Sequence, residues 1–163
     1  MKKQVGMLGM FLAFALLCSY IESLIPFYFG VPGMKLGLTN LVVVLLLYLY
    51  GPKEAFLVSF TRILLAGFLF GNAFSMIYSL AGGLCSWIVM TLLVKMRRFH
   101  VYSVSICGGI FHNLGQLLVA MFVAKNYYLL GYVPFLFLGG AVTGFLIGIA
   151  AREVYHRTYR YIK

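Results

Sequence analysis

Long apolar segments fill most of this chain, and almost all of its charged residues lie in the short stretches between them. Of the 163 residues, 63% are hydrophobic and 10% are charged, and the mean hydropathy is +1.00. A soluble globular domain is about 45–50% apolar and about 25% charged. The composition therefore excludes an ordinary soluble domain and predicts an integral membrane protein.

The length of the chain limits the number of membrane crossings. At about 20 residues per crossing helix, the chain accommodates six crossings with short loops. Breaker residues such as Pro26, Gly51 and Pro52 separate the apolar runs. We predict an all-α integral membrane protein, a six-transmembrane-helix bundle that forms a single transmembrane domain over residues 1–163. The predicted spans cover residues 4–25, 37–50, 54–70, 72–94, 102–124 and 129–152.

The basic residues predict the orientation of these spans. With six crossings, ten of them fall on one side: Lys2, Lys3, Lys53, Lys95, Arg97, Arg98, Arg152, Arg157, Arg160 and Lys163. The other side carries Lys35 and Lys125. Because loops rich in Lys and Arg stay in the cytoplasm, we expect a multi-pass protein of the cell membrane with both termini cytoplasmic. The net charge of +10 then reflects topology and attraction to anionic lipid headgroups, and we expect no nucleic-acid partner.

Acidic residues are scarce, which excludes several kinds of chemistry. The chain has no aspartate, and its three acids, Glu22, Glu54 and Glu153, lie near the ends of predicted spans, where we expect surface or interfacial roles. Paired-carboxylate hydrolysis and Asp-rich magnesium–diphosphate sites lack their residues. The phosphate-binding pattern Gly-x-x-x-x-Gly-Lys-Ser/Thr is also missing, and the three histidines lack metal-ligand spacing. We expect no cofactor, no metal and no autonomous enzyme.

Two basic residues are candidates for binding a ligand. Arg62 lies midway along a predicted span, where a charge costs about 2.5–3.5 kcal/mol, and no intramembrane carboxylate is expected to pair with it. It either binds backbone carbonyls or reaches one membrane surface, or it binds an anionic or carbonyl-bearing ligand. Lys35 precedes Thr39 and Asn40, which we interpret as helix N-cap residues beside an anion pocket. The alternative is an ordinary loop lysine at the headgroup level.

A polar stripe interrupts the fifth span. Residues 108–116 read GGIFHNLGQ, and the helical repeat aligns His112 with Gln116 and Gly109 with Asn113. Polar side chains within lipid are costly unless they face protein, water or a ligand. We predict that His112, Asn113 and Gln116 bind a ligand or line a pathway, together with Ser79 and Asn40. Hydrogen bonding between helices is the alternative.

Small residues recur at helical spacing in two other spans. The last span carries Gly140, Gly144 and Gly148, and the first carries Gly9 and Ala13. Such stripes are typical of close helix packing, including packing against a partner helix.

Three motifs carry a resemblance to a known family. They are residues 32–40 (PGMKLGLTN), residues 78–83 (YSLAGG) and residues 108–116. The pattern from residue 32 to Gly71 resembles the S components of energy-coupling-factor (ECF) vitamin transporters, which are six-helix bundles. In detail the chain resembles the Gx transporter family, also labelled heptaprenyl diphosphate synthase component I, over nearly its whole length.

The resemblance implies a membrane transport protein that binds a small ligand, anionic or isoprenoid-like, from the outer side. It also implies that the first span moves against a transmembrane coupling protein driven by separate ATPase subunits. A different function is implied by the synthase label: a non-catalytic membrane subunit in isoprenoid or quinone metabolism, partnered with a soluble prenyl synthase. A channel-like or purely structural bundle is a third possibility.

Overall fold

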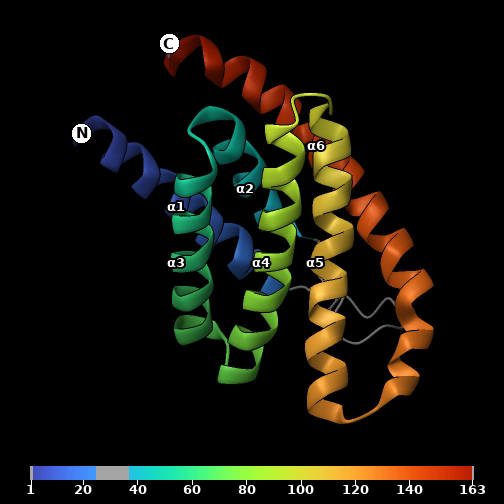
Figure 1. Cartoon of the computed structure of the whole chain (residues 1–163). Helices are drawn as coiled ribbons and strands as arrows, with labels where there is room; N and C mark the ends of the chain where they lie inside the picture. The colour runs from blue at the N-terminus through green and yellow to red at the C-terminus, as the bar shows by residue number, and fades with distance from the viewer. Residues whose placement is uncertain (1, 25–36, 163) are drawn as a thin grey trace.

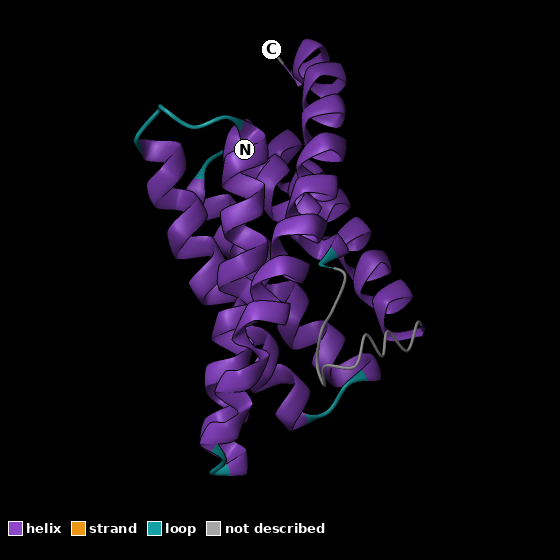
Figure 2. Ribbon diagram, turned by 90° about the vertical axis from the view of Figure 1, so that its right-hand side faces the viewer, coloured by secondary structure: helices purple, strands orange, loops and turns teal. Residues whose placement is uncertain are grey.

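The computed structural model describes residues 2–24 and 37–162, and for residues 2, 3 and 159–162 it describes the backbone alone. Within these ranges the chain is almost entirely helical and contains no β-strand (Figure 2). The elements are α1 (Lys2–Leu24), α2 (Leu38–Leu49), α3 (Pro52–Phe70), α4 (Ala73–Lys95), α5 (Val101–Ala124), the short 3₁₀ helix η1 (Tyr127–Tyr132) and α6 (Val133–Ile162). This architecture confirms the predicted fold class, an all-α membrane bundle.

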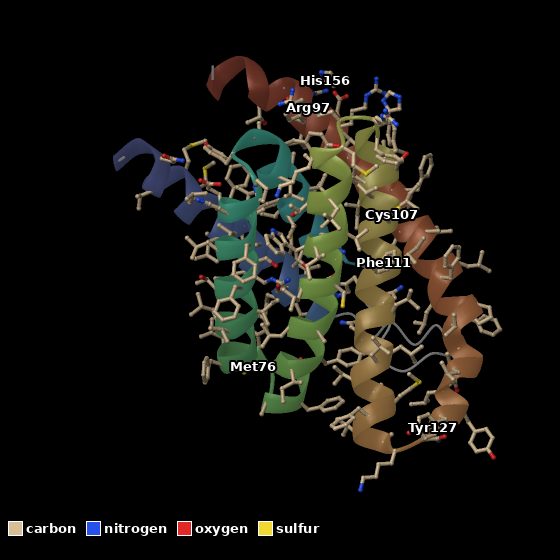
Figure 3. The ribbon with its side chains drawn as sticks, in the orientation of Figure 1. Met76, Arg97, Cys107, Phe111, Tyr127 and His156 are labelled. Atoms are coloured by element: carbon tan, nitrogen blue, oxygen red, sulfur yellow. The ribbon has the colours of Figure 1, made fainter. Side chains whose placement is uncertain are left out.

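The helices run up and down, so that both chain ends lie at the same end of the bundle (Figure 1). The α2–α3 and α4–α5 connections lie at this end too, and the α3–α4 and α5–α6 connections lie at the opposite end. Arg97 and His156 are at the end with the termini, whereas Met76 and Tyr127 are at the other (Figure 3). We call these the terminal end and the distal end.

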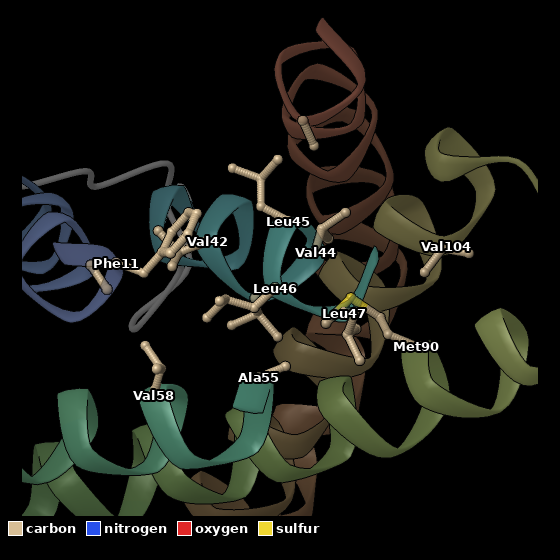
Figure 4. Packing of buried hydrophobic residues seen from close by; sticks show 13 residues of the cluster. Phe11, Val42, Val44, Leu45, Leu46, Leu47, Ala55, Val58, Met90 and Val104 are labelled. Carbon is tan, nitrogen blue, oxygen red and sulfur yellow. The ribbon is translucent and has the colours of Figure 1, made fainter. Parts of the chain in front are cut away.

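The short helix α2 forms the centre of the bundle. It packs against each of the five other α-helices, and residues Val42 to Leu47 are at most 5% exposed. Val42, Leu46 and Ala55 meet at the middle of this core (Figure 4). A helix that is apolar all round suits either a protein core or lipid. The near-continuous Val-Leu run of α2 is therefore compatible with its central place.

Within residues 2–24 and 37–162, four helices are long and apolar enough to cross a membrane by length and composition: Gln4–Leu24, Ala73–Lys95, Val101–Ala124 and Tyr127–Thr158. The central α2 has 12 residues, a length of about 18 Å at 1.5 Å per residue. That length is well below the roughly 30 Å thickness of the hydrocarbon core of a bilayer. The helix can be this short because the other helices enclose it.

Glycines bring α4, α5 and α6 into close contact. An added Cβ on Gly140 would lie 2.8 Å from both the Gly109 carbonyl oxygen and the Ile110 Cα, and one on Gly144 would lie 2.6 Å from the Ser105 oxygen. On the other side of α5, an added Cβ on Gly115 would lie 2.8 Å from the Ala81 oxygen of α4. These three helices therefore pack backbone against backbone, as small-residue stripes predict.

The last helix differs from its predicted bounds at both ends. It begins at Val133, four residues later than predicted, and Pro134 fits its first turn because proline has no N–H to leave unbonded there. It continues to Ile162, ten residues beyond the prediction. In the basic tail, Arg157 Nε donates a hydrogen bond to Glu153 Oε1, one turn earlier, at 2.8 Å, a pair that favours the helix slightly.

Candidate functional site

A polar cavity of about 220 Å³ lies between α1, α3 and α4. Its polar lining includes Arg62, Glu22, Ser19, Ser75 and Ser79. Met76 also lines it, and Figure 3 places Met76 toward the distal end. The cavity therefore extends from the distal end to Arg62, which is eight residues, or about 12 Å along the axis, from the end of α3.

The side chain of Arg62 is buried, with 7% of its surface exposed. Its Nη1 donates a hydrogen bond to Ser19 Oγ at 3.4 Å, which is near the upper limit for such a bond. A guanidinium carries five N–H donors, and a buried donor without an acceptor is costly. In the part of the chain that the structure describes, the Arg62 side chain makes this one long hydrogen bond. Other N–H donors of the Arg62 guanidinium therefore face the polar cavity.

Glu22 lies two residues before the end of α1, near a span end as expected. It also lines the same cavity and interacts electrostatically with Arg62, which the sequence did not indicate. Its Oε1 also accepts a hydrogen bond from the backbone N–H of Leu38 at 2.6 Å. A carboxylate at the start of a helix is favourable because it satisfies a free N–H and opposes the helix dipole.

The hydrogen bond between Leu38 and Glu22 shows that the first turn of α2 is capped differently from the prediction. The N-cap residue is Gly37, in the left-handed region at φ 73°, and it provides no side-chain cap. Thr39 and Asn40 lie inside the first turn and are both buried, so their prediction as N-cap residues was wrong. Glu22 of α1 takes over the capping role, which local sequence patterns cannot indicate.

The polar stripe of α5 faces other helices, away from this cavity. Asn113 Nδ2 donates a hydrogen bond to the Leu136 carbonyl oxygen of α6 at 3.0 Å. His112 and Gln116 pack against Gly82 of α4, where an added Cβ would meet their side chains at 3.2 and 2.7 Å. Gln116 is 1% exposed, and its Nε2 has no hydrogen-bond partner among the described residues.

The predicted ligand-binding residues thus fall into separate groups. The cavity brings Arg62 and Ser79 together. His112, Asn113 and Gln116 lie between α4, α5 and α6, and the buried Asn40 does not line the cavity. Lys35 lies outside the described residues. No described His, Cys or Glu side chains gather in the groups of three or more that a metal ion would need.

The predicted packing residues also divide into two groups. Gly140, Gly144 and Gly148 pack against α5 of the same chain. Gly9 and Ala13 lie on the exposed face of α1, and an added Cβ on Gly9 would meet no atom within 4 Å. Only the second group is open to a partner helix.

Serines of α1 belong to the cavity and were missed from the sequence. Ser19 and Ser23 line it beside Glu22. Their spacing of three and four residues places all three on one face of a helix, which is the signal that could have found them.

A second cavity, of about 420 Å³, is an apolar cleft between α3 and α4. Phe56, Phe60, Leu84 and Trp87 contribute to its wall. Ile63 lines both cavities, so one side chain separates the apolar cleft from the polar cavity.

Together, the bundle and the polar cavity define a helical membrane protein with a buried cation in the wall of a cavity. The chain belongs to the family described as heptaprenyl diphosphate synthase component I, which it matches over residues 11–154. This range contains Arg62, Glu22 and the α5 stripe, and it confirms the family predicted from the three motifs. Comparisons with curated proteins and with solved structures found no match.

Proposed function

We propose that this protein is the ligand-binding membrane subunit of a transporter, similar to the S components of ECF systems and without catalytic activity of its own. The observation that supports it most is the buried Arg62 guanidinium, which faces a polar cavity and has one long hydrogen bond within the described chain. An anionic ligand group would satisfy those donors. The ligand enters from the distal end, where the cavity extends.

Mass spectrometry of the detergent-purified protein tests this function. We expect a small anionic molecule to travel with the wild-type chain and to be absent from the Arg62→Gln variant. Reconstitution with the host's ECF coupling protein and ATPase subunits should then give ATP-dependent uptake of that molecule. Equal recovery of the molecule from both proteins would contradict the assignment of the site.

The exposed face of α1 is proposed to contact the coupling protein. Gly9 and Ala13 lie on it without covering atoms from the described chain, so another helix can approach closely. We predict that Gly9→Leu combined with Ala13→Leu leaves folding intact and reduces co-purification of a co-expressed coupling protein at least tenfold. The matched control is Ala150→Leu, at an exposed small residue of α6. Undiminished co-purification of the double variant would contradict this interface.

We propose that the protein lies in the cell membrane with its basic terminal end facing the cytoplasm, so that both termini are cytoplasmic. Arg98 lies on the α4–α5 connection at the terminal end, and Asn126 lies between α5 and η1 at the distal end. In a background without the three native cysteines, we predict that a membrane-impermeant maleimide labels Asn126→Cys in intact cells. It should label Arg98→Cys only after the cells are broken. The reverse pattern would overturn the orientation.

A second candidate function is a non-catalytic membrane subunit of heptaprenyl diphosphate synthase. Two observations favour it: the description of the matched family, which names one component of a synthase, and the apolar cleft between α3 and α4, which suits a hydrocarbon chain. Catalysis by this chain alone is not proposed, because it has no aspartate for an Asp-rich magnesium site. Stoichiometric co-purification of a co-expressed soluble prenyl synthase, without ATPase subunits, would favour this function.

A further inference from the structure

The apolar cleft between α3 and α4 lies directly beside the polar cavity that contains Arg62. Ile63 lines both spaces, and its side chain is buried. The same division continues on α4, where Ser79 lines the polar cavity and the next residue, Leu80, lines the cleft. Ile63 therefore forms part of a wall between a buried cation and a space lined by hydrocarbon.

Aromatic side chains hold the wall of the cleft in place. Trp87 Nε1 donates a hydrogen bond to the Pro52 carbonyl oxygen at 2.9 Å, which ties the indole of α4 to the start of α3. The centroid of the Phe56 ring lies 4.9 Å from that of Trp87 and 5.8 Å from that of Phe60. Separations of about 4.5–7 Å are those of favourable aromatic pairs. Contacts within the protein thus fix the cleft, as expected of a preformed binding site.

The lining of the cleft suits a hydrocarbon chain. Apart from Ser59 and Gly83, its lining side chains are aliphatic or aromatic, and its volume of about 420 Å³ is within the range of ligand pockets. Phe60 and Leu84 are exposed on the surface of the bundle, so the cleft opens toward lipid. Lipid tails are as apolar as these side chains, however, so a chain gains little by leaving lipid for the cleft. Selective binding there requires a second group of the same molecule to be held nearby.

Arg62 provides a place for that second group. It is adjacent to Ile63 in sequence, its side chain is more than nine-tenths buried, and it lines the polar cavity. Hydrogen bonds from a guanidinium to a carboxylate or a phosphate are about twice as strong as neutral ones. Glu22 already attracts this guanidinium, so a bound anion has to compete with that attraction. Contact between the cleft and a chain on the same molecule would add to the binding of the anion.

We propose that the ligand is a single-chain anionic amphiphile, whose head group lies against Arg62 and whose hydrocarbon chain passes Ile63 into the apolar cleft. The inference rests on the proposed ligand-binding function and specifies the chemical class of the ligand. Gly83 has no side chain to hold Ile63 in position, and an added Cβ there would lie 3.0 Å from Ile63 Cδ1. A change of the Ile63 rotamer can therefore open the passage between the two spaces.

Photo-crosslinking of the full chain in detergent tests where the hydrocarbon chain lies. The probes are twelve-carbon chains with a diazirine near the tail, which end in a carboxylate, a phosphate or, as the neutral control, a hydroxyl group. All three enter detergent micelles, so labelling that reflects apolar surface alone should be similar for the three. We expect at least one anionic probe to label the cleft residues Phe60, Leu84 and Trp87 at least tenfold more than the alcohol does, as measured by mass spectrometry of peptides.

Three variants assign the labelling to the two parts of the site. Arg62→Gln should reduce labelling by the anionic probe to the level of the alcohol. Leu84→Trp adds bulk in the cleft and should reduce labelling of Phe60 and Trp87 at least fivefold. Ile88→Trp is the matched control, because Ile88 is also an exposed aliphatic residue of α4 but lines neither space. This control should keep the labelling of the wild type.

Equal labelling of the cleft by the anionic probes and the alcohol would overturn the amphiphile, and so would undiminished labelling of Arg62→Gln. Calorimetry with butanoate, a short acid, then separates this failure from failure of the proposed function. If butanoate binds the wild type and not Arg62→Gln, the anion-binding function stands without the chain. If butanoate does not bind and no small molecule travels with the purified protein, the proposed function is overturned too.

Discussion

Arg62→Gln is expected to weaken binding of a small carboxylic acid in the polar cavity by about 10- to 100-fold. The physical reason is the loss of charge-assisted hydrogen bonds, which contribute about 1.5–3 kcal/mol each; a factor of ten corresponds to about 1.4 kcal/mol. The measurement is calorimetric titration of the detergent-purified variant. Arg62→Lys should give an intermediate loss, because an ammonium keeps the charge but not the planar fork of donors.

The ligand-free protein should show the opposite trend in stability. Arg62 is buried, and within the described chain its long hydrogen bond to Ser19 and the attraction of Glu22 offset only part of its desolvation, which is the largest effect on this group. We therefore expect Arg62→Gln to unfold at the same temperature as the wild type or a higher one when no ligand is present. A residue that served only the fold would give a lower temperature. Arg98→Gln, at an exposed arginine on the α4–α5 connection, is the control for a general loss of positive charge.

Much of the fold could be predicted from the sequence because lipid imposes simple rules. Every backbone polar group must be satisfied within its own segment, so apolar runs of sufficient length become helices. Gly140 and Gly144 could be assigned to helix packing on the same basis, and the structure places them against α5. The end of α6 was harder, because the helix continues through a basic and aromatic tail in which Glu153 and Arg157 pair.

The candidate site was only partly predictable, because it depends on which helices become neighbours. The cost of a charge within lipid marked Arg62 as exceptional. Its partner Glu22 is 40 residues away in sequence and reaches it only because α1 packs beside α3. The α5 stripe was recognised as one polar face, but periodicity cannot say which helix lies opposite a face. In the structure Asn113 donates a hydrogen bond to α6 and Gln116 packs against α4, which is the contact between helices that the sequence left open as the alternative.

A large effect on folding is expected at Gly140. A Cβ at this position would lie 2.8 Å from backbone atoms of α5, and backbone cannot move aside as a flexible side chain can. Gly140→Ala should therefore lower the free energy of unfolding by about 1–3 kcal/mol, the usual cost of overpacking. Gly140→Leu should prevent recovery of folded protein. Thermal unfolding followed by size-exclusion chromatography in detergent measures both.

Gly9→Ala is the matched control for this substitution. It replaces a helical glycine whose added Cβ would meet no atom within 4 Å. Alanine is the better helix former by up to about 1 kcal/mol, so this variant should be as stable as the wild type or more stable. Equal stability of Gly140→Ala and Gly9→Ala would contradict backbone contact between α5 and α6.

The two sets of variants also separate structure from function. The polar cavity is lined by α1, α3 and α4, whereas Gly140 lies in the contact between α5 and α6. Protein carrying Gly140→Ala that remains folded should therefore keep the ligand affinity of the wild type. Arg62→Gln should lose affinity and keep its stability. If Gly140→Ala loses affinity in proportion to stability, ligand binding must involve the α5–α6 contact, and the polar stripe from Gly108 to Gln116 would become the stronger candidate site.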